Sequence, residues 1–319
     1  MELTWRCNAH CRFCSYWKTP NEPQFDMPFS TAKKFIDGVS KMGKKPRLEI
    51  LGGEPTLHPH IKEVISYCKK KQVWPSIVTN GFMFADYDFA KRLIDSGIDS
   101  INVSLEGFKE QNDFLRGKGN YDKAIQGIKN IKKIKNVHIT ILSVITSKNL
   151  KILPEFFKDL HDQKLIDKCN LQALYCDFRK ENGEGWWSNN PLWPTDQEMV
   201  EKGIDRLIEL KEQTNLIRNS EQQMEFWKTY FKDPTNHKKI DCNIDKFFTY
   251  CACTGDILIC PDMPSVGNIN KNKLSDILLS ENAEQRRISI RACTRLCHSR
   301  VSCFFEQLKP EETPNINRS

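Results

Sequence analysis

Three cysteines near the start of the chain have the spacing of a metal-cluster motif. Cys7, Cys11 and Cys14 follow the pattern Cys-x3-Cys-x2-Cys, directly after a short apolar stretch. Thiolates at such short spacing can wrap one small iron–sulfur cluster. Three cysteines leave one iron of a four-iron cluster open, and an open position distinguishes a catalytic metal site from a closed structural one. The alternative is a structural zinc site that takes His10 as its fourth ligand.

The remaining cysteines also indicate metal. Of thirteen in the chain, three form the motif, seven lie between residues 242 and 303, and only Cys68, Cys169 and Cys176 lie in the long stretch between. Thiols stay reduced in the cytosol, so clustered cysteines there indicate metal before disulfides. We expect a cytoplasmic protein, because the first residues resemble no secretion signal and no apolar run approaches the ~18 residues of a membrane helix.

The elements that must position these residues alternate between short apolar runs and amphipathic patterns over residues 1–175. This alternation predicts βαβ units around a parallel sheet. We expect strands at Glu2–Trp5, Arg47–Leu51, Ser76–Thr79, Ser100–Leu105, His138–Val144 and Asn170–Tyr175. Helices are expected near Ser30–Met42, His60–Lys71, Asp86–Ser96, Tyr121–Lys135 and Leu153–Gln163. Six such repeats fit an α/β fold of the partial (β/α)6, TIM-like kind, in which chemistry gathers at the carboxyl ends of the strands.

On this framework the cysteine motif resembles the hallmark of the radical S-adenosylmethionine (SAM) superfamily, in which an aromatic residue, here Phe13, precedes the third cysteine. The residues after the second strand, Gly52, Gly53, Glu54 and Pro55, resemble the family's GGEP motif. The resemblance implies a catalytic [4Fe-4S] cluster whose open iron binds S-adenosylmethionine, and a GGEP segment that receives the methionine amino group. Reductive cleavage then gives a 5′-deoxyadenosyl radical that abstracts hydrogen from a substrate. Glycines suit a backbone that approaches a ligand closely.

Polar residues after the next strands come in the family's order. Asn80 follows the third strand, Ser104 lies at the end of the fourth, and Arg116 comes shortly after it. The resemblance implies that Ser104 contacts the ribose or carboxylate of the cofactor and that Arg116 pairs with the carboxylate, a role suited to a guanidinium. Each residue alone also fits turn chemistry or a surface ion pair. Their ordered occurrence favours a cofactor site.

The C-terminal cysteines are similar to the SPASM and twitch extensions of this superfamily, small β-hairpin and helix domains that hold auxiliary iron–sulfur clusters. The resemblance implies auxiliary ligands among Cys242, Cys260, Cys293, Cys297 and Cys303. The spacing departs from a full SPASM motif, with a first gap of three and no cysteine beyond position 303, so one auxiliary [4Fe-4S] cluster is favoured over two. A zinc ribbon is the competing interpretation.

The predicted hairpin of this domain consists of Phe247–Ala252 and Asp256–Ile259, with Thr254 and Gly255 at its turn. Cys251 and Cys253 lie two residues apart on its first strand and therefore face the same side. Either one of them is a ligand or both are simply buried.

The resemblance leaves two classes of substrate open. Relatives with such extensions act largely on peptides, which implies oxidative modification, cross-linking or epimerisation of a peptide; a minority act on small molecules, as dehydrogenases or rearrangement enzymes. A flavodoxin- or ferredoxin-type protein would supply electrons. A non-catalytic zinc-binding module is the alternative from a different class.

One further cysteine is a candidate for the chemistry itself. Cys176 ends the sixth predicted strand, where a side chain can point into the barrel mouth. We hypothesise that it donates a hydrogen atom or a proton to the substrate radical. The alternative is a packed thiol.

The net charge and the pattern along the chain also predict its partners and its domain boundaries. A formal net charge of +7, from 48 basic and 41 acidic residues, is mild for 319 residues and does not favour a nucleic-acid partner. We expect a barrel over residues 1–195, a helical connector over 196–235, an auxiliary-cluster domain over 236–310 and a disordered tail over 311–319.

Overall fold

The computed structural model describes residues 1–135, 137–175, 185–237, 244–294 and the single residues 242, 297 and 301, with only the backbone at position 247. Cys176, Cys303 and the tail at 311–319, on which three predictions depend, lie outside the described residues.

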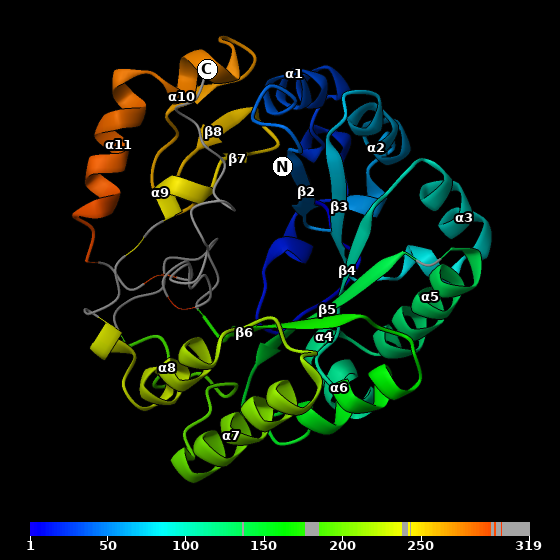
Figure 1. Cartoon of the computed structure of the whole chain (residues 1–319), viewed down its shortest axis with the longest axis vertical. Coiled ribbons are helices and arrows are strands. Elements are labelled where there is room, and N and C mark those ends of the chain that lie inside the picture. The colour runs from blue at the N-terminus through cyan, green and yellow to red at the C-terminus, as the bar shows by residue number, and fades with distance from the viewer. Residues whose placement is uncertain are drawn as a thin grey trace.

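A six-stranded parallel sheet forms the centre of the N-terminal part (Figure 1). Its strands follow one another in chain order: β1 (Glu2–Thr4), β2 (Arg47–Gly52), β3 (Trp74–Thr79), β4 (Ser100–Ser104), β5 (His138–Ile145) and β6 (Lys168–Ala173). The predicted α/β fold with six parallel strands is confirmed. Among the described residues the sheet does not close on itself, as expected of a partial barrel.

Helices line the outer side of this curved sheet (Figure 1). The predicted ones are α1 (Phe29–Val39), α2 (Ile61–Lys70), α3 (Tyr87–Asp95), α5 (Asn120–Ile134) and α6 (Leu153–Asp162). Each places apolar residues on one face at helical spacing, and those faces are buried. Cys68 belongs to the buried face of α2. No helix in the described ranges is long and apolar enough to cross a membrane.

A short helix that the sequence did not predict, α4 (Lys109–Arg116), follows β4. Its inward residues are Asn112, Leu115 and Arg116, so only one of the three is apolar. The apolar stripe that identifies the other helices is therefore absent from its sequence. The helix is stabilised instead by polar contacts to the ends of the strands, described below.

The predicted connector covers one edge of the sheet. It contains α7 (Gln197–Thr214) and α8 (Glu221–Lys232), joined by a segment that runs beside β6. Cys169 exchanges backbone hydrogen bonds with Leu216 and Arg218, and the Asn219 side chain both accepts from and donates to the backbone of Leu171. These bonds satisfy backbone groups that an edge strand would leave unpaired.

The C-terminal unit is a small antiparallel sheet with helices beside it. The sheet consists of β7 (Tyr250–Cys251), β8 (Asp256–Leu258) and β9 (Gly267–Asn268), and the helices are α9 (Ile244–Phe247), α10 (Leu274–Leu278) and α11 (Glu281–Arg291). The hairpin strands are shorter than predicted, and β9, α9 and α11 were not predicted. Gly255 has φ of 87°, a left-handed conformation that favours glycine at the predicted turn.

Single turns of 3-10 helix occur at Tyr16–Lys18, Pro23–Phe25, Pro55–Leu57, Met83–Ala85 and Pro234–His237. The first of these directly follows the N-terminal cysteine motif, and the third follows the GGEP segment.

Candidate active site

The loop with Cys7, Cys11 and Cys14 follows β1 and lies against the end of α4. The backbone N–H groups of His10 and Arg12 donate to the carbonyl oxygens of Arg116 and Leu115, at 3.2 and 2.9 Å. These carbonyls belong to the last turn of the helix, where no partner within the helix is available. The unpredicted helix α4 therefore supplies the surface on which the cysteine loop rests.

Side-chain hydrogen bonds also hold the start of this loop. The Arg6 guanidinium donates to both carboxylate oxygens of Asp26, at 2.9 and 2.7 Å, and to the carbonyl oxygen of Leu57. The side-chain amide of Asn80 donates to Oδ1 of Asn8 at 2.7 Å. Asn80 thus contacts the residue next to Cys7, and Asn8 is a site residue that sequence reasoning missed.

Gly52 and Gly53 lie directly beneath the start of the loop. A Cβ at Gly52 would lie 2.3 Å from the carbonyl oxygen of Thr4, and one at Gly53 would lie 2.2 Å from that of Arg6. Gly52 also has φ of 139°. No other residue type fits this approach without displacing backbone. Both glycines are needed to seat the cysteine loop on β2, whatever they also do for a ligand.

The Glu54 carboxylate is fully buried and has several donors around it. Oε1 accepts from the N–H of Thr56 at 3.1 Å and from the hydroxyls of Thr56 and Thr79, while Oε2 accepts from the N–H of Asn80 at 2.7 Å. Burial raises the pKa of Glu54 above its ordinary value, and these hydrogen bonds oppose the rise. Glu54 thus joins the end of β2 to the end of β3.

The three thiols of the motif influence one another. Burial and the Glu54 carboxylate raise the pKa of Cys7 to about 12, and the neighbouring thiols of Cys11 and Cys14 add to the rise. Burial raises the pKa of Cys11 to about 11, although the Arg116 guanidinium opposes it. Both of these pKa values lie well above neutral pH, so metal binding at the two thiols would displace protons, and the donor set suits a metal centre.

These thiols are not arranged around a single ion. In the described part of the chain, no group of three or more His, Cys, Asp or Glu side chains is placed to hold one metal ion. A four-iron cluster is wider than one ion, and its soft sulfur ligands stand correspondingly farther apart. The described residues therefore contain no preformed zinc site that includes His10.

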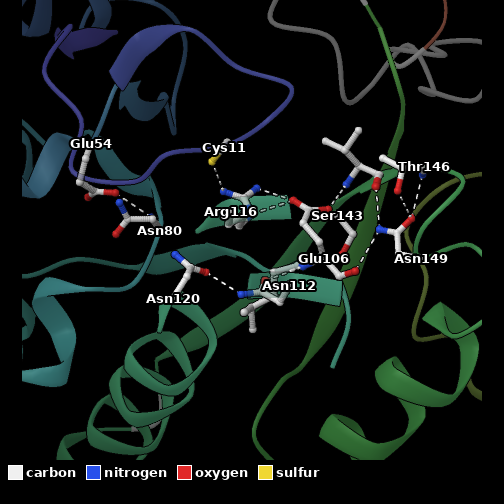
Figure 2. Close-up of polar contacts among 12 residues, drawn as sticks. Cys11, Glu54, Asn80, Glu106, Asn112, Arg116, Asn120, Ser143, Thr146 and Asn149 are labelled. Carbon is white, nitrogen blue, oxygen red and sulfur yellow. Dashed lines mark hydrogen bonds and ion pairs between the residues drawn. The ribbon is translucent and has the colours of Figure 1, made fainter. Parts of the chain in front are cut away.

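Arg116 lies between the cysteine loop and a buried acid, Glu106 (Figure 2). Its Nε and Nη2 atoms donate to Oε1 of Glu106 at 2.8 and 2.5 Å, and its Nη1 atom lies 3.7 Å from Sγ of Cys11. The guanidinium carbon is also 5.5 Å from the centre of the Phe13 ring. Burial raises the pKa of Glu106 above its ordinary value, and the charge of Arg116 opposes that rise.

Ser104 and Glu106 lie close together at the carboxyl end of β4. Ser104 is the last residue of the strand and is buried, 8% exposed. Glu106 follows two residues beyond the end of this strand, and sequence reasoning did not select it. The structure thus brings Phe13, Asn80 and Arg116 to the cysteine loop, with Ser104 at the same strand ends.

The C-terminal cysteines form a second neighbourhood. Burial raises the pKa of Cys260 to about 11, and the nearby thiols of Cys242 and Cys293 contribute. Cys297 is 9% exposed. The charged neighbours of Cys251 are instead the N-terminal ammonium of Met1, Asp256 and Glu2, and its thiol is fully buried.

The family is settled by comparison with known proteins. A family model described as the radical SAM superfamily matches residues 1–160, half of the chain. The chain belongs to the radical SAM superfamily. The predicted family is confirmed, and with it the prediction of an enzyme. The family implies a [4Fe-4S] cluster and S-adenosylmethionine.

Curated relatives of this radical SAM chain include two enzymes with different named functions. Fe-coproporphyrin III synthase of Methanosarcina barkeri is 31% identical over 176 residues, which are 54% of this chain and 43% of that protein. The mycofactocin maturase MftC of Mycobacterium tuberculosis is 31% identical over 156 residues, 49% of this chain and 39% of that protein. The matched region therefore spans less than half of either relative.

Solved structures resemble this radical SAM chain over most of its length. The structure of anSMEcpe with bound AdoMet has a TM-score of 0.66 at 17% identity, covering 94% of this chain and 86% of that one. SuiB of Streptococcus suis bound to the precursor peptide SuiA has a TM-score of 0.66 at 17% identity, covering 95% of this chain and 70% of that one. At these identities the likeness shows the fold.

Proposed function

We propose that Cys7, Cys11 and Cys14 hold the catalytic [4Fe-4S] cluster of an enzyme that modifies a peptide oxidatively, by dehydrogenation or cross-linking, or epimerises one. The observation that carries the first part is the gathering of three mutually interacting thiols over the carboxyl ends of β2, β3 and β4. When bound, the cluster and S-adenosylmethionine supply a 5′-deoxyadenosyl radical that abstracts hydrogen.

The chain's own residues would bind and orient the cofactor. Phe13 and Arg116 lie beside Cys11, and Ser104 and Asn80 lie at the neighbouring strand ends. Arg116 has donor groups left after its two bonds to Glu106, since a guanidinium carries five N–H groups. These would pair with the carboxylate of S-adenosylmethionine.

Gly52, Gly53 and Glu54 would act at the amino group of the same ligand. The two glycines let the backbone carbonyls of the segment approach closely. The Glu54 carboxylate already accepts from Thr56, Thr79 and Asn80. We therefore propose that Glu54 mainly fixes the backbone of the segment, and with it the carbonyl groups that would face the ligand.

A second part of the proposal concerns the C-terminal unit, which would hold one auxiliary [4Fe-4S] cluster as in SPASM and twitch domains. The thiols of Cys242 and Cys293 lie near enough to Cys260 to help raise its pKa, and Cys297 is buried beyond α11. Cys303 completes the candidate ligands, outside the described residues. Such a cluster would accept an electron from the substrate radical.

A peptide is the favoured substrate because the likeness in fold to anSMEcpe and SuiB extends over the C-terminal unit, beyond the family match at residues 1–160. Both of those proteins have been solved with peptides bound. A small molecule is the second candidate, favoured by the relative named Fe-coproporphyrin III synthase. In either case a flavodoxin- or ferredoxin-type protein would donate electrons, and Cys176 would donate a hydrogen atom or a proton to the substrate radical.

The cluster assignment is tested by anaerobic purification. We expect a brown protein with about four irons per N-terminal site and 5′-deoxyadenosine on reduction with S-adenosylmethionine. Replacing Cys7, Cys11 and Cys14 by Ala should abolish 5′-deoxyadenosine while leaving a second cluster signal. A colourless protein that binds only zinc would contradict the proposal.

The substrate class is tested separately, with peptides encoded beside the gene and with a porphyrin-class precursor from which iron coproporphyrin III would form. Loss of two hydrogens from a peptide, or uptake of deuterium from D2O, would support peptide modification. Conversion of the porphyrin alone would replace it with the second candidate. If Cys176→Ala changes neither product yield nor product identity, the thiol has no part in the reaction.

A further inference from the structure

Glu106 is a buried carboxylate whose two oxygens have different partners. Oε1 accepts from Nε and Nη2 of Arg116, and Oε2 accepts from the N–H of Val144 at 2.6 Å. The Glu106 side chain is 0% exposed and that of Arg116 10%. Neither oxygen can be replaced by an amide nitrogen without giving up one of these donors.

The backbone around Glu106 is held from three directions (Figure 2). The N–H of Glu106 donates to Oδ1 of Asn112 on α4, and Nδ2 of Asn149 donates to the carbonyl oxygens of Glu106 and Val144, at 3.0 and 2.9 Å. The hydroxyl of Ser143 donates to the carbonyl oxygen of Leu105. The carboxylate therefore has one orientation available to it.

This orientation of Glu106 turns the remaining nitrogen of the Arg116 guanidinium, Nη1, towards one thiol of the motif. With Nε and Nη2 occupied by Glu106, the planar guanidinium places Nη1 3.7 Å from Sγ of Cys11. A lysine has no such fork and could not contact both groups in this geometry. In contrast, the guanidinium of Arg6, also beside the loop, donates to oxygen atoms of Asp26, Asn21 and Leu57.

We propose that Glu106 is a positioning residue that holds Arg116 against the Cys11 sulfur, and that this charged contact raises the reduction potential of the cluster bound by the motif. The inference rests on the proposed function, because it requires a cluster on Cys7, Cys11 and Cys14. Hydrogen bonds to cluster sulfurs and net charge nearby set the potentials of iron–sulfur centres. A cation at the sulfur stabilises the reduced cluster, which carries one more negative charge.

The test is a double-mutant cycle on the midpoint potential of the N-terminal cluster, measured by electron paramagnetic resonance without S-adenosylmethionine. The cycle compares wild type, Arg116→Gln, Glu106→Gln and the double variant. In the wild-type background, Arg116→Gln should lower the ratio of reduced to oxidised cluster about tenfold at a given solution potential, which is ~59 mV for one electron. In the Glu106→Gln background the same substitution should have less than half that effect.

The cycle separates positioning by Glu106 from the direct effect of its charge on the cluster. If Glu106 acts only through its charge, Arg116→Gln shifts the potential equally with and without Glu106. If Glu106 positions Arg116, the shift is smaller without Glu106. If Arg116→Gln alone binds iron poorly, the comparison is between wild type and Glu106→Gln, because loss of positioning lowers the potential whereas loss of a nearby negative charge alone raises it. Equal shifts in the two backgrounds, or no shift on removing Arg116, would overturn the inference.

A matched control removes a second ion pair beside the same loop. The control variant combines Arg6→Gln with Asp26→Asn. Like the double variant of Glu106 and Arg116, it removes one positive and one negative charge and leaves the net charge unchanged, but it removes no donor to sulfur. Its potential should stay within a third of the shift seen for the Glu106 and Arg116 pair; an equal shift would attribute the effect to general loosening of the loop.

The paramagnetic signal of the N-terminal cluster is identified as the one that disappears when Cys7, Cys11 and Cys14 are replaced by Ala. If wild type has no such signal, the proposed function fails and the inference fails with it. If the signal is present but shows no coupling between Glu106 and Arg116, only the inference fails.

Discussion

Two buried acids, Glu54 and Glu106, have the same role at different strand ends. Glu54 accepts the N–H of Asn80 and so ties β2 to β3; Glu106 accepts the N–H of Val144 and so ties the end of β4 to β5. Charge-assisted hydrogen bonds of this kind are stronger than neutral ones. The geometry of the site therefore depends on carboxylates that bind the scaffold.

Replacing Glu54 by Gln should destabilise the metal-free protein. Each oxygen of the carboxylate accepts a backbone N–H, from Thr56 and from Asn80, so an amide nitrogen would face a donor whichever way it turned. One unsatisfied buried donor costs about 1–3 kcal/mol of unfolding free energy. Urea denaturation measures the loss, with the exposed Glu63→Gln on α2 as the control. Equal midpoints for the two variants would contradict this role.

Asn8→Ala should reduce the iron retained after anaerobic gel filtration. The substitution removes the acceptor for the side chain of Asn80, and with it one of the bonds that hold the start of the cysteine loop. We expect iron to fall by at least a third while the circular dichroism spectrum stays the same. Asn21→Ala, which removes an exposed acceptor of Arg6, serves as the control. Full iron retention in Asn8→Ala would show that the contact is dispensable.

At the scale of elements, the strands and most helices of the barrel were predictable because their apolar residues alternate or recur on one face. β4 and β5 have buried residues such as Ile101, Val103 and Ile141, and these dominated the pattern. Helix α4 could not be found this way, since its buried face contains Asn112 and Arg116. Polar residues that are buried for the sake of a site give no periodic signal, and Glu106 and Asn8 were missed for the same reason.

The start of β6 depends on an ionised carboxylate. Asp167 accepts from the N–H of Ile139 at 2.7 Å and from Nζ of Lys132 at 2.8 Å. Burial raises the pKa of Asp167, but these two donors lower it more, so the pKa lies below its ordinary value of 3.8. The unfolded chain therefore binds the proton first, and stability is lost as the pH falls below about 3.8.

Asp167→Asn should accordingly lower the unfolding free energy by about 1 kcal/mol at pH 7. The difference from wild type should shrink as the pH falls through 3.8 towards the folded-state value, because the wild-type carboxyl is then protonated as well. Urea titrations at several pH values measure this. Asp95→Asn removes an exposed pair with Lys91 and should show little difference at any pH. A pH-independent effect of Asp167→Asn would contradict the linkage.

At the scale of the whole molecule, the C-terminal unit packs on α1 (Figure 1). Thr31 on α1 donates to Oδ1 of Asn270, and the backbone N–H of Cys253 donates to Glu2 on β1 at 3.4 Å. Gly38 on α1 lies so near α10 that a Cβ there would be 2.5 Å from Cβ of Leu274. The two units meet across a closely packed contact.

Gly38→Ala should therefore destabilise the protein by about 1–3 kcal/mol, as overpacking does. The sign of the change in unfolding free energy is informative, because in a free helix Gly→Ala would stabilise by about 1 kcal/mol. In a Leu274→Gly background the added methyl group has room, and Gly38→Ala should become stabilising. Thermal unfolding of the four variants measures the cycle. Stabilisation by Gly38→Ala in the otherwise wild-type chain would mean that the two units are not in this contact.

The docking of the cysteine loop on α4 has a consequence for how the protein matures. The amides of His10 and Arg12 donate to carbonyls of Arg116 and Leu115, so the loop is held by the polypeptide and not by its metal. We therefore expect folding and metallation to be separate events. A chain that loses the proposed cluster should stay folded and accept a new one, unlike small domains that unfold when metal is withdrawn. Slow hydrogen exchange at these two amides in metal-free protein is the measurable sign of a site that outlasts its cofactor.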